Sequence, residues 1–182
     1  MPTASASDPT PYTSSSRTTD ASRAFASGTI SLARPRDRAS IAIDSAPITG
    51  RTGSLREGVA PISSLCFIAQ VGTMLVGSVR LNAIKAGGSK ALILGPLAVE
   101  PAFSDRGIGS RLMEMALDKA RADGHALVFL VGDEPYYQRF GFKMVPPGRV
   151  TMPGPVDPAR FLVLELQEGA LTGVSGLLMP AS

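Results

Sequence analysis

Three consecutive segments with strand character, joined by short turns, most constrain what this chain can fold into. Residues 65–70 form an apolar run, and residues 74–81 alternate about Gly77 and Val79 after a turn at residues 71–73. Two glycines at residues 86–89 predict a hairpin turn before a third, largely apolar strand at residues 91–99. Strands joined this tightly run antiparallel, so the sequence predicts a meander whose third strand is buried on both faces.

Pro96 interrupts the third strand. Proline has no backbone N–H to donate, so a buried strand accommodates it at a bulge or where strand pairing stops. We therefore expect the third strand to part from a neighbour near Gly95 and Pro96. The splayed sheet would leave backbone groups that a ligand could bind.

A helix is predicted after this strand, over residues 107–122. Its apolar stripe has helical spacing, and Gly124 follows as a stop signal. The stripe consists of Ile108, Leu112, Met115 or Ala116, and Ala120. A strand at residues 126–131, a short helix at 135–140 and strands at 142–145 and 161–166 complete the pattern. The expected fold is mixed α/β, with a right-handed crossover after the antiparallel meander.

The turn that opens this helix has the composition of an anion site. The first N–H groups of a helix are free, and the positive end of the helix macrodipole lies behind them. Gly107 and Gly109 allow close approach to the backbone, while Arg106 and Arg111 add positive charge. The turn therefore predicts a pyrophosphate cradle, although glycines that serve only a tight turn remain an alternative. Leu112 stands where a dinucleotide-binding fingerprint needs its third glycine, and no Walker A lysine follows.

The composition excludes several other chemistries. A single cysteine, Cys66, excludes an internal disulfide and a cysteine metal cluster, and a single histidine, His125, leaves no metal or triad spacing. The net charge of +3 is scattered, which argues against nucleic acid as a partner. No apolar run reaches the roughly 18 residues of a membrane span. We expect a soluble, cytoplasmic protein.

The chain divides into a tail and one domain. Twelve of the first 28 residues are Ser or Thr without apolar periodicity, so residues 1–28 are predicted to be a disordered tail and 29–182 the folded domain. The domain is expected to begin with a short strand about Ile30 and Leu32, which Pro35 ends, and a short helix at residues 37–43. Residues 45–63 are rich in glycine, proline and serine, with one helical turn at residues 54–57.

Two motifs in order carry a family resemblance. Val99-x-Pro101 followed by Arg106-Gly107-Ile108-Gly109-Ser110-Arg111-Leu112 resembles the acetyl-CoA motif of GNAT acyltransferases. Tyr136-Tyr137-Gln138-Arg139-Phe140-Gly141-Phe142 resembles the second mark of that superfamily. Together with Leu94-Gly95-Pro96-Leu97 and Val131-Gly132-Asp133, the pattern is similar to the YhbS-like branch of predicted acetyltransferases.

The resemblance implies a fold and a reaction. The fold is the GNAT α/β (α+β) fold, whose mixed, mostly antiparallel central sheet is flanked by helices and splayed near the cofactor. The reaction is direct attack of an amine on the thioester of acetyl-CoA, with Tyr137 as the acid that protonates the departing thiolate. The implied acetyl-CoA contacts are Leu97, Ala98, Val99, Arg106, Gly107, Ile108, Gly109, Ser110 and Arg111.

Three departures from the family pattern leave an alternative open. Ser104 occupies the position where many relatives carry Gln or Arg, the strand at 91–99 has no carboxylate to act as base, and the region before residue 65 is short and rich in helix breakers. A catalytically inactive acyl-CoA-binding or sensor protein would share the fold. A nucleotide-binding protein of another fold rests on the glycine turn alone. The strand at residues 161–164 could pair within one chain or across a homodimer.

Overall fold

The computed structural model describes residues 30–33, 55 and 59–181 of the 182-residue chain. The predicted tail at 1–28 and the helix expected at 37–43 lie outside the described residues, as does the turn expected at 54–57 except for Leu55.

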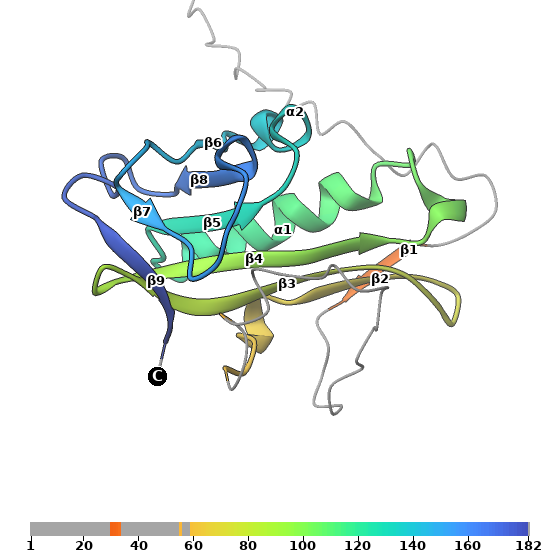
Figure 1. Cartoon of the computed structure of the whole chain (residues 1–182). Coiled ribbons are helices and arrows are strands. Elements are labelled where there is room, and N and C mark those ends of the chain that lie inside the picture. The colour runs from red at the N-terminus through yellow and green to blue at the C-terminus, as the bar shows by residue number, and fades with distance from the viewer. Residues whose placement is uncertain (1–29, 34–54, 56–58, 182) are drawn as a thin grey trace, which may run out of the picture.

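The described chain forms a sheet with one long helix on one face (Figure 1). The main path of the sheet has the order β1-β2-β3-β4-β5-β8-β6. Its strands are β1 (Ile30–Ala33), β2 (Phe67–Val71), β3 (Met74–Ala86), β4 (Ser89–Val99), β5 (Leu127–Val131), β8 (Phe161–Glu165) and β6 (Lys143–Met144). Only β4 and β5 pair in parallel on this path, so the mixed, mostly antiparallel sheet is confirmed.

The predicted meander is present as β2, β3 and β4. β3 is longer than expected because it continues past Leu81 to Ala86. The hairpin turn at Gly87 and Gly88 has φ of 54° and 96°, the positive values that the two-residue turn expected there requires. β2 begins at Phe67 rather than residue 65, because the 3-10 helix η2 (Ser63–Leu65) precedes it.

The expected parting of the sheet lies at Pro96. β3 pairs with β4 as Val79 with Leu97 and as Leu81 with Leu94, so β4 carries an extra residue between them. The parallel pairing of β4 with β5 stops at Ile93 and Phe129. Both accommodations of a proline, a bulge and an end to strand pairing, therefore occur together at one place.

The long helix α1 (Ile108–Ala122) lies across β2, β3 and β4. It ends in a Schellman motif, in which His125 N–H donates to the carbonyl of Ala120 and Gly124 N–H to that of Arg121. Gly124 has φ of 80°, as a helix stop requires. The predicted stripe is buried at Ile108, Leu112, Ala116 and Ala120, while Met115 is only partly buried.

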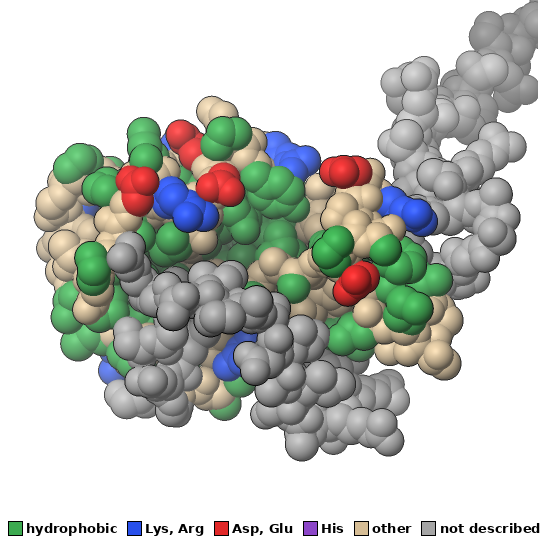
Figure 2. All heavy atoms as spheres, turned by 45° about the vertical axis from the view of Figure 1, so that its right-hand side comes forward, with side chains coloured by type: hydrophobic (Ala, Val, Ile, Leu, Met, Phe, Trp, Pro, Cys, Tyr) green, Lys and Arg blue, Asp and Glu red, His purple; other side chains and the backbone are tan. Residues whose placement is uncertain are grey.

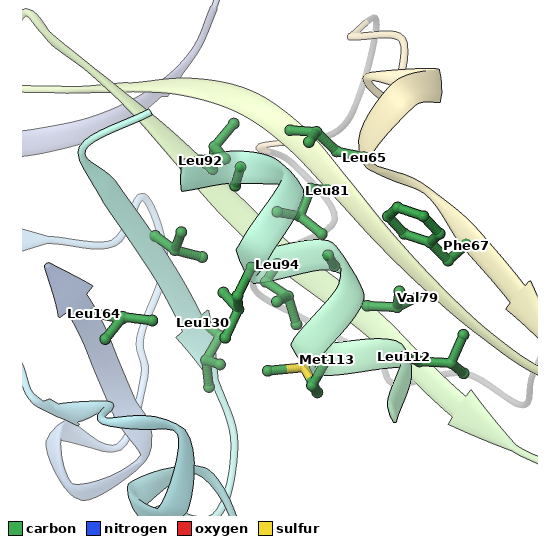
Figure 3. Packing of buried hydrophobic residues seen from close by; sticks show 14 of the residues in the cluster. Leu65, Phe67, Val79, Leu81, Leu92, Leu94, Leu112, Met113, Leu130 and Leu164 are labelled. Atoms are coloured by element: carbon green, nitrogen blue, oxygen red, sulfur yellow. The ribbon is translucent and has the colours of Figure 1, made fainter. Parts of the chain in front are cut away.

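Two hydrophobic cores hold the two faces of the sheet. The first lies under α1, where leucines from β3, β4 and β5 surround the helix (Figure 3). The second lies on the opposite face and includes Phe129, Phe161 and Leu55, which is completely buried. In the described structure this second face is covered by the chain after residue 144 and not by a helix.

Two short strands in that covering segment were not expected from the sequence. β9 (Gly176–Pro180) pairs with Ile84, Lys85 and Ala86 of β3, and β7 (Val150–Thr151) pairs with β9 in parallel. Figure 1 shows β9 crossing the end of the sheet opposite to the N-terminus of α1. Residues 161–165 pair with both β5 and β6 of the same chain, which answers the choice that the sequence left open.

The hairpin glycines provide a matched test of this packing. A Cβ added to Gly87 would lie 1.5 Å from the carbonyl oxygen of Ser175, whereas a Cβ added to Gly88 would meet nothing within 4 Å. Gly88→Ala should cost only the left-handed strain of about 1–2 kcal/mol. Gly87→Ala should cost several kcal/mol more, because it also displaces the segment before β9. Urea unfolding of both variants would measure the difference, and equal losses would contradict the contact with Ser175.

Candidate functional site

The open edge of β4 is the first component of the site. Glu100 N–H donates to the carbonyl of Val76, which fixes the phase of the ladder between β3 and β4. In an antiparallel pair, hydrogen-bonded and non-hydrogen-bonded residues alternate, so Ala98 directs its backbone groups to β3. Leu97 and Val99 therefore direct theirs to the opposite side, where β5 has already separated from β4.

The N-terminus of α1 is the second component. Gly107 is the N-cap in the left-handed region, with φ of 76°, and no side chain caps this end. The first intrahelical bond runs from Arg111 N–H to the Gly107 carbonyl, so the N–H groups of Ile108, Gly109 and Ser110 precede the helical ladder. The helix has no acidic residue in its first turn, which leaves its positive end uncompensated.

Gly109 joins these two components. A Cβ at this position would lie 3.5 Å from Val99 Cγ2 and 2.8 Å from the hydroxyl of Tyr136. The space beside Gly109 is therefore bounded by the open part of β4, the first turn of α1 and a tyrosine. The Cβ position is already taken by these neighbours, so glycine allows the first turn of α1 to lie close against β4 and Tyr136.

The two arginines of the glycine turn differ in their surroundings. The Arg106 guanidinium lies 5.2 Å from the centre of the Phe103 ring, in the loop before the helix. Arg111 Nη1 is 3.3 Å from Glu114 Oε2, and both side chains are more than half exposed. Both cations remain at the helix N-terminus, where they can turn towards an anion.

Tyr137 is held at the end of α2 (Glu134–Tyr137), beside the carboxyl end of β5. Its ring packs so closely on Gly132 that a Cβ there would come within 2.2 Å of Cε2. The ring meets Tyr136 and Phe142 edge-on, at centroid distances of 4.9 and 5.9 Å. Burial, reinforced by Tyr136 and the Asp133 carboxylate, raises the pKa of Tyr137 to about 12. The phenol is therefore a proton donor throughout the neutral and mildly alkaline range.

Tyr136 and Arg139 form a support that the sequence alone did not assign. Arg139 stacks over the Tyr136 ring with its guanidinium carbon 3.9 Å from the centroid, and its Nε donates to the Tyr136 carbonyl at 2.9 Å. Tyr136 packs against Arg139 and Tyr137, and its hydroxyl also reaches the glycine turn. The spacing Tyr136-x-x-Arg139 within a helical segment is the signal that could have indicated this stacking.

A groove of about 330 Å³ lies between the outer face of α1 and the 3-10 helix η4 (Gln138–Phe140). It is lined by Ser110, Glu114, Leu117, Asp118, Arg121, Arg139 and Phe140. Because Ser110 belongs to the first turn of α1, the groove adjoins the glycine turn. On the face shown in Figure 2, hydrophobic side chains gather in a hollow and Asp, Glu, Lys and Arg side chains lie along its upper edge.

The acidic residues after β5 border the same region. Asp133 Oδ1 is 3.2 Å from Arg160 Nε, and Asp133 is largely exposed. Glu134 begins α2 and is half-buried. His125, by contrast, lies at the opposite end of α1, where its backbone N–H bonds to the Ala120 carbonyl.

The structure brings most of the predicted site residues to one place. Leu97 and Val99 lie at the open edge of β4, next to the turn of residues 106–111. Tyr137 reaches the region through its contact with Tyr136. Ala98 differs from Leu97 and Val99, because its backbone groups are directed to β3 and not to the open edge. Among the described residues no cluster of His, Cys, Asp or Glu could hold a metal ion, and no described helix is long and apolar enough to cross a membrane.

Comparisons with known proteins point to one family. Residues 63–144 match the model of the acetyltransferase (GNAT) domain. The chain is 30% identical over 106 residues to the uncharacterized N-acetyltransferase YhbS of Escherichia coli K12. That match covers 57% of this chain and 64% of YhbS, slightly less than two thirds of its length. The uncharacterized N-acetyltransferase YjhQ of the same strain is 41% identical over 51 residues, or 28% of each chain.

The fold agrees with a solved relative. The crystal structure of Escherichia coli YhbS in complex with CoA superimposes with a TM-score of 0.59 and 27% identity. It covers 64% of this chain and 66% of that one. The family match at residues 63–144 includes β4, the glycine turn and α1.

The raised pKa of Tyr137 has a measurable consequence for stability. A phenol whose pKa is about 12 in the folded protein and about 10 unfolded stabilises the fold fully below pH 10, and this contribution is lost as the pH rises towards 12. At pH 11 the loss should be about 1.4 kcal/mol in the wild type and absent from Tyr137→Phe. Urea unfolding of both proteins at pH 9 and pH 11 checks this, and equal pH dependence would place the phenol in water.

Proposed function

We propose that this protein is an acetyl-CoA-dependent N-acyltransferase, because residues 63–144 match the model of the acetyltransferase (GNAT) domain. It transfers an acetyl group to an amine of a small molecule or protein. In the reaction, the amine nitrogen bonds to the thioester carbonyl carbon, the C–S bond breaks, and the sulfur leaves with a proton.

One observation carries the proposal. The unpaired edge of β4 and the uncapped N-terminus of α1 meet at Gly109, where a Cβ would collide with the Tyr136 hydroxyl and only a glycine allows so close an approach. A long anionic thioester needs this combination, because its amide-containing arm can bond to a strand edge while its phosphates bind helix amides. The CoA bound to the similar YhbS of Escherichia coli supports the same class of donor for this chain.

The residues that would hold the donor follow from the directions of their backbone groups. The N–H groups of Ile108, Gly109 and Ser110 are suited to the pyrophosphate, with Arg106 and Arg111 adding charge. Leu97 and Val99 are suited to the pantetheine and to orienting the thioester carbonyl. Acetyl-CoA supplies the activated acetyl group, and the protein contributes chiefly by positioning the amine against it.

Tyr137 is the proposed general acid. Its pKa of about 12 keeps the phenol protonated, and its ring is fixed by Gly132 and Phe142. A positioned phenol can protonate a thiolate as it leaves, which prevents the reverse attack. Tyr136 and Arg139 act as positioning residues, because they support the ring of Tyr137 without a proposed contact to the reacting atoms.

A second candidate function is acyl-CoA binding without catalysis. It is favoured by the lack of an evident general base. β4 has no carboxylate, and the carboxylate of Asp133 is paired with Arg160. An amine acceptor would then have to arrive neutral or lose its proton through water. Turnover distinguishes this candidate from the first one.

The cofactor assignment is tested by calorimetric titration with acetyl-CoA, with NAD and ATP as controls. We expect selective binding, and Gly109→Val should weaken it about tenfold or more because the added side chain would collide with Tyr136 and force the helix amides away from β4. Ala122→Val is the matched control, since it adds the same branching to the exposed last turn of α1. Equal affinity in the wild type and Gly109→Val would rule out the cradle.

The acid assignment is tested by CoA release from acetyl-CoA with a panel of amines. Tyr137→Phe should lower turnover by about 10²-fold or more while acetyl-CoA affinity stays nearly constant, because the phenol acts on the leaving group. Tyr12→Phe makes the same change in the segment predicted to be a tail and should keep wild-type turnover. Undiminished turnover in Tyr137→Phe would remove the phenol from the mechanism. Acetyl-CoA binding without turnover of any amine would favour the non-catalytic candidate.

A further inference from the structure

Arg80 lies in β3 directly opposite the point where the sheet opens. Its neighbours Val79 and Leu81 pair with Leu97 and Leu94, so Gly95 and Pro96 of β4 are the residues that face Arg80. The gap between β4 and β5 begins one residue earlier, after Ile93. Only β4 therefore lies between Arg80 and the gap. The backbones of β3 and β4 are one strand spacing apart, or about 4.8 Å.

The side chain of Arg80 belongs to the face of the sheet opposite to α1. A Cβ on Gly77 would contact Ile108 and Leu112 of α1, and Val79 and Leu81 belong to the core beneath that helix. Because side chains alternate along a strand, Arg80 and Asn82 lie on the other face. The proposed acetyl-CoA site occupies the α1 side, so this second face is the one from which an acceptor could approach the gap.

A buried amide holds the guanidinium in a fixed orientation. Asn82 is completely buried, and its Nδ2 donates to the carbonyl of Val59 at 3.1 Å. This bond orients the amide so that Oδ1 accepts from Arg80 Nε, also at 3.1 Å. Asn82 thereby fixes Nε, while the two terminal nitrogens of Arg80 keep the planar fork that matches a carboxylate.

No counter-charge balances Arg80 within the described part of the chain. Arg80 is half-buried, yet it takes part in none of the ion pairs among the described residues. Cys66 is an ionisable residue on which Arg80 acts electrostatically, and burial raises the pKa of its thiol, against weaker opposing effects of a Leu81 hydrogen bond and of Arg80 itself. The thiol therefore stays neutral at physiological pH. A half-buried cation without an anion is costly unless a ligand supplies one.

We propose that Arg80 binds a carboxylate of the acceptor, so that the substrate is an amine that also carries a carboxylate, such as an amino acid. The inference rests on the proposed function, and it specifies the acceptor of that same site. Asn82 is the positioning residue for Arg80. Binding of the carboxylate on this face would leave the amine free to enter the gap towards the thioester.

The substrate class is tested with matched acceptors that differ only in the carboxylate. The panel consists of ω-amino acids of increasing chain length and the alkylamines of the same lengths, with phosphoethanolamine and ethanolamine as a phosphate pair. We expect kcat/KM to be about ten- to a hundredfold higher for the best amino acid than for its alkylamine, as a charge-assisted bond would give. A preference for phosphoethanolamine over every amino acid would contradict the assignment of a carboxylate.

Variants of Arg80 identify the residue responsible. Arg80→Gln should raise KM for the amino acid about tenfold or more and abolish its preference over the alkylamine, because the carboxylate contact is lost. Arg80→Lys should retain part of the preference, since it keeps the charge but loses the fork. Lys85→Gln removes one positive charge from the same strand beyond the gap and should keep the full preference. Melting temperatures of all three variants show whether each remains folded.

A binding measurement separates failure of this inference from failure of the proposed function. Titration of the CoA-saturated protein with the same amino acids, followed by NMR, should detect binding that Arg80→Lys weakens and that the alkylamines lack. Acetyl-CoA binding and amine turnover without any carboxylate preference would overturn the role of Arg80 while leaving the acyltransferase intact. Absence of both acetyl-CoA binding and turnover would overturn the proposed function itself.

Discussion

The separation of β4 from β5 is the constraint on which the rest of the site depends. Pro96 cannot donate to a ladder, and β4 responds with an extra residue opposite β3 and an early end to its pairing with β5. Pairing up to Ile93 still anchors β5 in the sheet. Beyond that point the backbone groups of Leu97 and Val99 are left to a ligand. Pro96, a residue that strands disfavour, thus opens the sheet at one end, while β4 and β5 stay paired up to Ile93.

The position of α1 turns this opening into a defined site. Gly77 has no side chain where Ile108 and Leu112 would come within 3.1 Å of a Cβ, so the first turns of the helix lie close against the sheet. Close packing at this end brings the uncapped amides of α1 beside the open part of β4. Gly109 then allows this close approach, because a Cβ there would collide with the Tyr136 hydroxyl. Three residues, Pro96 in β4, Gly77 in β3 and Gly109 in α1, therefore shape the same small region where the helix N-terminus meets the open edge of β4.

The sequence predicted the parts whose signals are local, and it failed where contacts join distant segments. Pro96, the hairpin glycines and the stripe from Ile108 to Ala120 each express a backbone or periodic requirement, so the meander, the parting and α1 could be found. β9 could not, because its short pairing with β3 depends on a turn at Gly87 that meets Ser175. The contact of Tyr136 with the glycine turn likewise joins elements almost thirty residues apart.

The same reasoning explains why the polar residue pair Arg80 and Asn82 was not singled out from the sequence. Within an alternating strand they resemble solvated positions, and only the pairing register puts Arg80 opposite Gly95 and Pro96. Burial of Asn82 then distinguishes the pair from solvated residues, since a buried amide with both a donor and an acceptor bond fixes the orientation of the Arg80 guanidinium. The opening made by Pro96 therefore separates two chemistries: helix amides suited to phosphates on one face, and a fixed guanidinium suited to a carboxylate on the other.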